Sequence, residues 1–130
     1  MLVSVTRLRL RSIRYLLPFA YHAKRSRRQA ESAAGCRRVH VRKTRGLTFW
    51  TLSLWESEAA LRQYLTGGAH RQAMPKLAQW CDEAAVTHWE HETTDEPSWD
   101  AAAARLAKQG RLSRVLHPSA AHQEGRIEIT

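Results

Sequence analysis

Hydrophobic and polar residues alternate over several stretches of this chain. Residues 2–10 have a period of two, with leucines along one face and valines at the start of the other, which predicts a β-strand. The same alternation predicts three more strands, over residues 36–44, 47–55 and 85–91.

Amphipathic stretches with helical spacing separate these strands. Ser12 can cap a first helix that Gly35 ends, and Pro18 predicts a kink or a break within it. Ser57 can cap a second helix, which ends at Gly67. Both helices lie between predicted strands, as helices that cover a sheet do.

The remaining elements are less regular. A helical stretch around Pro75 is expected to be kinked, or to begin properly near Met74. A last helix is predicted over residues 99–109, capped by Ser98. We expect one domain over residues 1–117 and a flexible tail over residues 118–130.

The order of the elements predicts an α+β fold of the ferredoxin-like βαββαβ type, with a four-stranded antiparallel sheet and an extra C-terminal helix. The strand over residues 47–55 is apolar on both faces, with Trp50, Leu52 and Leu54 on one of them. Helices on one side of the sheet would leave the other face open, and large exposed apolar patches are rare on monomers. We therefore expect a symmetric homodimer in which two such faces pack together.

Charge is distributed unevenly along the chain. Residues 1–45 carry 13 Lys or Arg and the single acid Glu31, in a chain of formal net charge +9. Such a basic half is typical of a nucleic-acid or anionic-membrane partner, or of a solvated face on one helix and one strand. It has few aromatic residues for base stacking and no nucleic-acid motif, so nucleic acid ranks last among the partners considered.

No segment predicts a transmembrane span, a secretory signal or a metal centre. Residues 15–21 are too few to cross a bilayer, and arginines interrupt the stretch before them. We expect a cytoplasmic protein without a membrane partner. Cys36 and Cys81 have no metal-ligand spacing and are expected to be reduced, and strand alternation sends His88 and His91 to opposite faces.

One segment carries a family resemblance. Residues 54–58, Leu-Trp-Glu-Ser-Glu, with His70 further on, resemble the dimeric α+β barrel superfamily, which includes antibiotic-biosynthesis monooxygenases and some heme-degrading oxygenases. Residues 69–71, Ala-His-Arg, and residues 97–99, Pro-Ser-Trp, are similar to an uncharacterised bacterial branch of it. The resemblance covers residues 2–112. It implies the fold and a dimeric barrel, and is nearly silent on the reaction.

The heme-degrading members offer a specific test. They use an Asn, a Trp and an axial His at positions that fall here on Thr6, Tyr64 and Met74. All three differ, which argues against heme degradation by that mechanism. His70 lies one turn before Met74 and could replace the axial ligand after a small change of register. We expect no cofactor, with heme as the open alternative.

Cofactor-independent monooxygenases of the superfamily bind flat aromatic substrates between sheet and helices, in an apolar cavity with a few polar groups. The resemblance implies His70 and Tyr64 as catalytic residues here, with His70 as a possible base. The expected substrate-binding residues are Trp50, Trp55, Trp80, Met74 and Thr6. Core packing is the alternative role for the tryptophans.

These observations predict a small-molecule-binding protein, with cofactor-independent oxygenation of an apolar or aromatic substrate as its candidate activity. The alternative is a dimeric scaffold or binding protein without catalysis. A heme-binding protein and a nucleic-acid binder rank below both. The sequence leaves open whether the protein is an enzyme.

Overall fold

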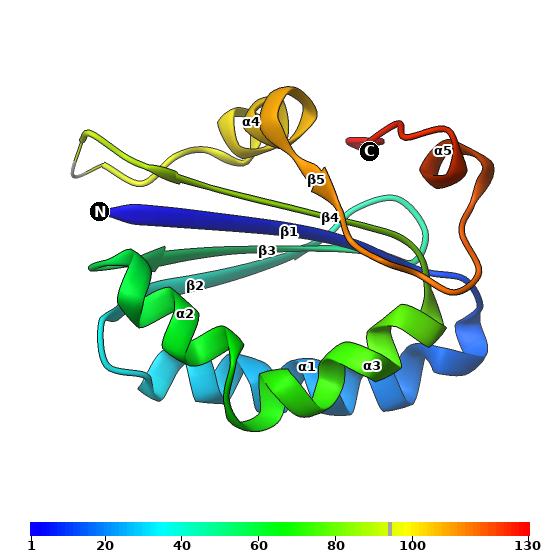
Figure 1. Ribbon diagram of the computed structural model, residues 1–130, viewed down its shortest axis with the longest axis horizontal. Helices are drawn as coiled ribbons and strands as arrows, with labels where there is room; N and C mark the ends of the chain where they lie inside the picture. The colour runs from blue at the N-terminus through cyan, green and yellow to red at the C-terminus, as the bar shows by residue number, and fades with distance from the viewer. Residues whose placement is uncertain (94) are drawn as a thin grey trace.

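The computed structural model describes residues 1–93 and 95–130 and shows one sheet with helices on both of its faces (Figure 1). In chain order the elements are β1 (Leu2–Leu10), the 3-10 turn η1 (Ile13–Tyr15), α1 (Leu16–Ser32), β2 (Cys36–Lys43), β3 (Thr48–Trp55), α2 (Glu58–Leu65), α3 (Gly68–Trp80), β4 (Cys81–Glu90), α4 (Trp99–Gln109), β5 (Arg111–Leu112) and α5 (Ala120–Gln123).

The sheet is antiparallel with strand order β2-β3-β1-β4-β5, so β1 lies at its centre. The first four strands have the order of a ferredoxin-like fold, which confirms the predicted fold class. The short strand β5 was not predicted. It extends the sheet beyond β4, where Leu112 pairs with Ala85.

Helices α1, α2 and α3 cover one face of the sheet, which we call the helix-side face (Figure 1). Alternation along β1 turns Leu2 and Leu10 towards these helices and Val3 and Val5 away from them. On β3, Trp55 likewise packs on the helix side, where it contacts Leu2 and Leu61. The two faces that the sequence predicted for β3 are confirmed.

The opposite face is covered within the same chain. Trp50, Leu52 and Leu54 are only 2%, 2% and 1% exposed, because α4 packs over them through Ala102 and Leu106. We expected this face to need a second subunit. The structure supplies α4 instead, so the apolar face by itself no longer requires a dimer, and the homodimer stays a prediction.

Pro18 and Pro75 each lie within one continuous α-helix. Pro18 lies in the first turn of α1, where its missing N–H would have had no partner within the helix. Helix α3 begins at Gly68 and runs through Pro75, so the expected start near Met74 is wrong. Gly68 has φ +56°, a conformation in which side chains are strained, and this fixes the sharp passage from α2 into α3.

The C-terminal segment makes specific contacts. Ser119 caps α5, and its hydroxyl also donates to Glu83 Oε2 (2.7 Å). The guanidinium of Arg7 donates to the backbone oxygen of Thr130 from Nε (3.3 Å) and Nη2 (3.2 Å). Residues 118–130, expected as a flexible tail, therefore lie against β1 and β4.

Two features are absent from the described part of the chain. It contains no helix long and apolar enough to cross a membrane. Nor do the residues described there include a group of three or more His, Cys, Asp or Glu placed to hold a metal ion.

Candidate functional site

Three of the predicted site residues pack together where the end of β3 lies against α2 and α3. The ring of Tyr64 stacks on Trp55 with 5.2 Å between centroids, and the imidazole of His70 packs against the Tyr64 ring at 4.9 Å. Trp55 ends β3, Tyr64 lies near the end of α2, and His70 lies in the first turn of α3. We call these three residues the aromatic cluster.

Gln29 of α1 fixes the geometry of this cluster. Its side-chain Nε2 donates to the carbonyl oxygens of Tyr64 (3.2 Å) and Gly67 (2.9 Å), and its Oε1 accepts from the backbone N–H of His70 (2.8 Å). One amide thus joins the end of α2 to the beginning of α3, where backbone groups lack helical partners. The Tyr64 hydroxyl donates to the carbonyl oxygen of Ser26 (3.3 Å), so its ring points towards α1.

Burial sets the protonation of both polar members of the cluster. It raises the pKa of Tyr64 to about 12, with a smaller contribution from Cys36, so the phenol is neutral at physiological pH. Burial lowers the pKa of His70, and a hydrogen bond to Leu65 opposes this only in part. Nδ1 of His70 lies 3.2 Å from the Leu65 carbonyl oxygen and must be its protonated nitrogen, because a carbonyl only accepts. Nε2 is then the basic nitrogen of a neutral imidazole.

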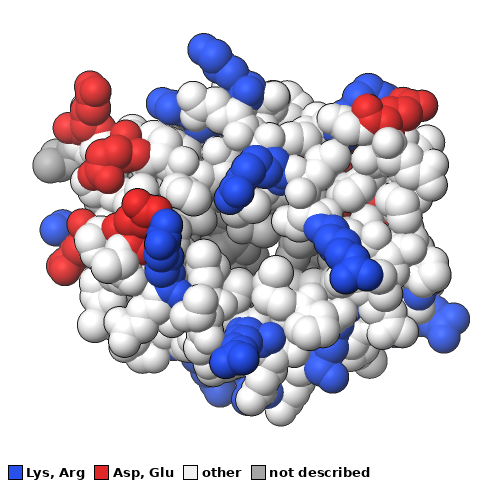
Figure 2. Space-filling model, in the orientation of Figure 1, with Lys and Arg blue, Asp and Glu red and all other residues white. Residues whose placement is uncertain are grey.

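A groove opens on the other side of α2, between that helix and the β4–β5 edge of the sheet. Its volume is about 530 Å³, within the range of small-molecule pockets. Figure 2 shows a hollow near the centre of this view of the molecule, with Lys and Arg side chains around it. The groove is lined by Glu58, Leu61, Arg62, Leu65, Thr87, His88, Gln109 and Arg111.

The sequence explains why these residues converge. Glu58, Leu61, Arg62 and Leu65 follow helical spacing and therefore share the side of α2 that faces the groove. The wall across from them comes from β4 and from the junction of α4 with β5. The resulting groove has aliphatic groups from one helix and hydrogen-bonding groups from both walls.

The sheet beside the groove is unusually polar for a surface under helices. Ser4 of β1 lies between Ser53 of β3 and His88 of β4, and all three belong to the helix-side face. The next pair along, Thr6 and Thr51, also faces the helices, and both are only half-buried. The helix layer covers Ser4 and Ser53, which are buried, whereas His88 is exposed and lines the groove.

The sequence family described as a domain of unknown function, DUF3291, matches residues 19–112. The chain belongs to the DUF3291 family. No curated protein matches it. The match includes β2, β3, β4 and β5 but not β1, and it includes every element that lines the groove.

Solved structures with the same fold show what this DUF3291 protein resembles. A conserved protein from Methanosarcina mazei Go1 superposes with a TM-score of 0.63 at 16% identity, over 70% of this chain and 92% of its own. An antibiotic biosynthesis monooxygenase gives 0.64 at 10% identity, over 72% and 100%. A cofactor-independent oxygenase from Streptomyces nogalater gives 0.61 at 13% identity, over 74% and 97%. At these identities the likeness establishes the fold.

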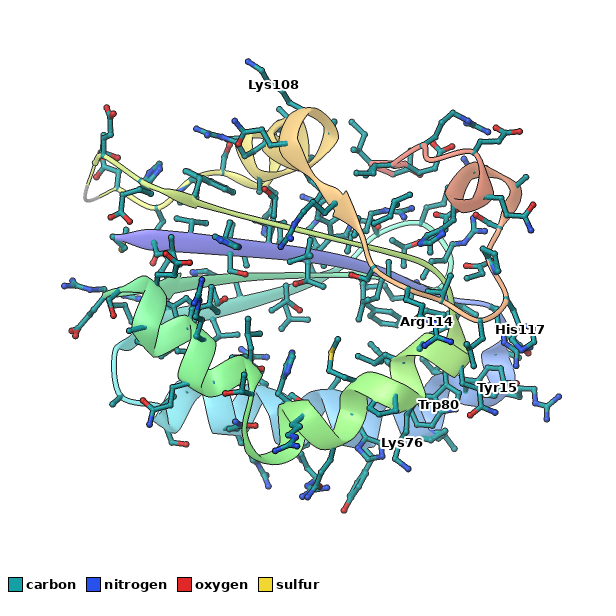
Figure 3. All side chains as sticks on the ribbon, viewed as in Figure 1. Tyr15, Lys76, Trp80, Lys108, Arg114 and His117 are labelled. Atoms are coloured by element: carbon teal, nitrogen blue, oxygen red, sulfur yellow. The ribbon has the colours of Figure 1, made fainter. Side chains whose placement is uncertain are left out.

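The DUF3291 structure separates the other predicted site residues from the aromatic cluster. Trp50 packs on the opposite face of the sheet, where its indole N–H donates to Thr44. Trp80 ends α3 and stacks on Tyr15 at 6.2 Å, at the end of the molecule where Figure 3 labels both. Met74 is 45% exposed on α3. None of the seven residues predicted for the site is among those that line the groove.

Sequence reasoning missed the polar groups of the groove. His88 was considered only as a metal ligand, and Gln109 and Arg111 were not considered at all. A signal existed for His88, since alternation along residues 85–91 puts it on the face opposite Ala85. The register of the sheet then pairs it with Ser4 on the helix-side face. No local signal marks Arg111, because it belongs to a two-residue strand.

Heme does not fit the positions at which the superfamily would hold it. Tyr64 and Met74 stand where the family's Trp and axial His would be, and neither supplies an imidazole. His70, the alternative ligand, keeps Nε2 free because Nδ1 donates to the Leu65 carbonyl. Its ring packs against Tyr64, however, and His70 is not among the residues that line the groove. The chemistry proposed below therefore does not involve heme.

Proposed function

We propose that this DUF3291 protein binds a small apolar or aromatic molecule in the groove between α2 and the β4–β5 edge. The observation that carries this proposal is the groove itself, which combines the aliphatic side chains of Leu61 and Leu65 with the polar groups of His88, Gln109 and Arg111. An apolar wall with a few directed polar groups is typical of small-molecule sites.

We further propose that the bound molecule is oxygenated without a cofactor, as the name of the Streptomyces nogalater relative states for that protein. A substrate that loses a proton becomes an electron-rich anion that can reduce O₂ directly. One oxygen atom replaces the two hydrogens of the reacting CH₂ carbon as a carbonyl oxygen, and those two hydrogens leave with the other oxygen atom as water. This chemistry needs a base beside the substrate, and His88 is the imidazole that lines the groove.

The aromatic cluster supports the groove in this proposal. Trp55 is fully buried, and Tyr64 and His70 use their polar atoms for bonds to backbone carbonyls. Together with Gln29 they fix the end of α2, and Leu61 of that helix both packs with Trp55 and lines the groove. In this proposal Tyr64 and His70 position that helix, and their catalytic role stays a prediction from the sequence.

Ligand binding is tested by NMR titration with 2-naphthol, a neutral aromatic probe. We expect shifts at the Leu61 and Leu65 methyl groups and at His88. Leu65→Trp should fill the groove and abolish these shifts. Val41→Trp, at a residue exposed to a similar degree on β2, serves as the matched control and should retain them. Shifts confined to other parts of the molecule would contradict the proposed site.

Oxygenation is tested separately, by oxygen uptake with oxidisable hydroxyaromatic compounds that bind. We expect His88→Gln to retain binding and to lose oxygen uptake by a factor of about 100 or more, the usual contribution of a general base. Binding without any oxygen uptake would favour the non-catalytic binding protein instead.

A further inference from the structure

The start of α1 exposes apolar side chains that no other part of the described chain covers. Ile13, Leu17 and Tyr21 are 73%, 82% and 61% exposed. They are four residues apart, so they form one stripe along η1 and the first turns of α1. Lys24 and Arg28 continue the same side of the helix. We call these five residues the α1 surface.

The surroundings of this stripe are cationic. No Asp or Glu precedes Glu31 in the sequence, whereas Arg14, Lys24, Arg25 and Arg28 lie on or beside the stripe. Figure 2 shows Lys and Arg side chains along the lower margin of the molecule, where α1 and α3 lie in Figure 1.

Two further observations show that positive charge gathers here. Lys76, which Figure 3 labels on α3, and Arg25 both lower the pKa of His22, after the larger effect of its burial. Arg25 also lies over the ring of Tyr21, 5.6 Å from its centroid, and so reaches the apolar stripe itself.

We propose that the α1 surface docks on an anionic lipid bilayer. Aliphatic and tyrosine side chains on an exposed helix, with Lys and Arg beside them, match the two layers of a membrane surface, acyl chains below and anionic headgroups above. This inference is independent of the groove and of its ligand.

The same charges disfavour the other candidate occupants. A second copy docked on this surface would bring two cationic stripes together, which is repulsive. A nucleic acid would neutralise the cations but would leave Ile13 and Leu17 in contact with a phosphate backbone. The sequence predicted no membrane partner because no segment can cross a bilayer, and docking on a bilayer surface needs no such segment.

Vesicle sedimentation tests the proposal on the full chain. We expect the protein to sediment with vesicles of phosphatidylcholine and phosphatidylserine at low salt, and far less with phosphatidylcholine alone. Each cation near an anionic surface contributes about fivefold to the partition coefficient. K24Q/R28Q should therefore weaken binding by about tenfold or more, whereas Lys108→Gln, on α4 at the opposite side in Figure 3, should change it little.

The apolar stripe provides the decisive variant, because any strongly basic protein binds anionic vesicles to some extent. I13S/L17S keeps every charge and removes two side chains that contact little within the fold. We expect it to weaken vesicle binding by about tenfold or more, through loss of apolar burial. The matched control is Ile129→Ser, at an isoleucine 46% exposed in the C-terminal segment, which should bind as the unmodified protein does.

Each alternative has its own outcome. Unchanged vesicle binding by I13S/L17S would show that charge alone acts and would overturn the proposal. So would a DNA duplex that binds as tightly as the vesicles and competes with them. Self-association that I13S/L17S abolishes, without vesicle binding, would assign the surface to a second copy and would also overturn it.

Discussion

Tyr64 and His70 are titratable residues whose pKa values are shifted by burial. Their rings pack against each other, and each uses a polar atom to bond a backbone carbonyl of a neighbouring segment. Removal from water disfavours the charged form of both, so the pKa of the phenol rises and that of the imidazole falls. Both residues are consequently neutral over a wide range of pH.

The phenol can be observed directly by ultraviolet titration. We expect one tyrosine to ionise with a pKa of about 12, and this step to be missing from Tyr64→Phe. The other two tyrosines, Tyr15 and Tyr21, provide the internal reference. An unchanged high-pH step in Tyr64→Phe would contradict the burial of this hydroxyl.

His70 should make the fold sensitive to mild acid. Its folded-state pKa lies below the unfolded value of about 6.5, so the unfolded chain binds more protons as the pH falls below that value. Its contribution to stability is full above about pH 6.5 and decreases below it. In urea unfolding, His70→Gln should lose less stability than the unmodified protein between neutral pH and mild acid.

A matched variant controls for the other histidines. His117 lies exposed near the end of the molecule in Figure 3, and His117→Gln should show the same acid loss as the unmodified protein. Equal losses for His70→Gln and the unmodified protein would contradict the prediction.

At the scale of elements, β1 and β4 are joined by a buried ion pair. Nη1 of Arg7 lies 2.8 Å from Glu83 Oε1, with side chains 3% and 6% exposed. Burial opposes ionisation of Glu83, but hydrogen bonds from Arg7 and Ser119, with the charge of Arg9, outweigh it and hold the pKa of the carboxyl below its usual value. The neighbouring residue of β4, Asp82, pairs with Arg9.

Breaking this pair should destabilise the fold strongly. Glu83→Gln leaves the guanidinium of Arg7 buried without its carboxylate, which costs about 3–5 kcal/mol. Because the folded pKa is depressed, the contribution of Glu83 is present above the unfolded pKa of about 4.3 and is lost as the pH falls through the folded value. Urea unfolding at neutral pH measures the effect.

The control uses an exposed pair. Glu58→Gln removes the partner of Arg62, a pair of which both members are exposed, and should cost less than about 1 kcal/mol. A similar loss of stability in the two variants would contradict the special role of the buried pair.

At the scale of the whole molecule, the sheet is covered on both faces by one chain. The helix layer covers one face, and α4 with the C-terminal segment covers the other (Figure 1). Val3, Leu52 and Leu54 are thereby shielded from water without a second subunit. Any self-association would use surfaces other than this core.

Thermal unfolding measured over a range of protein concentrations distinguishes a monomer from the homodimer predicted from the sequence. A monomer has a midpoint of thermal unfolding that is independent of protein concentration, whereas the midpoint of a homodimer rises with it. Leu106→Ala, at a fully buried residue of α4, should lower the midpoint without creating a concentration dependence. A midpoint that rises with protein concentration would support the dimer predicted from the sequence.

The sequence determined the four long strands, most of the helices, the two faces of β3 and the fold class, because periodicity and capping residues are local signals. It also brought Trp55, Tyr64 and His70 into one hypothesis through the family resemblance. The covering of the second face was decided by tertiary structure. The helix over residues 99–109 was predicted, but no local pattern states which surface a helix will cover.

The groove was likewise decided only in three dimensions. Its walls come from α2, from β4 and from the α4–β5 junction, segments that are distant in sequence and adjacent only after the sheet forms. The unequal charge of the N-terminal half was visible from the start. Only the fold showed that an uncovered apolar stripe lies beside these cations, because exposure depends on what packs against a helix and not on the helix's own sequence.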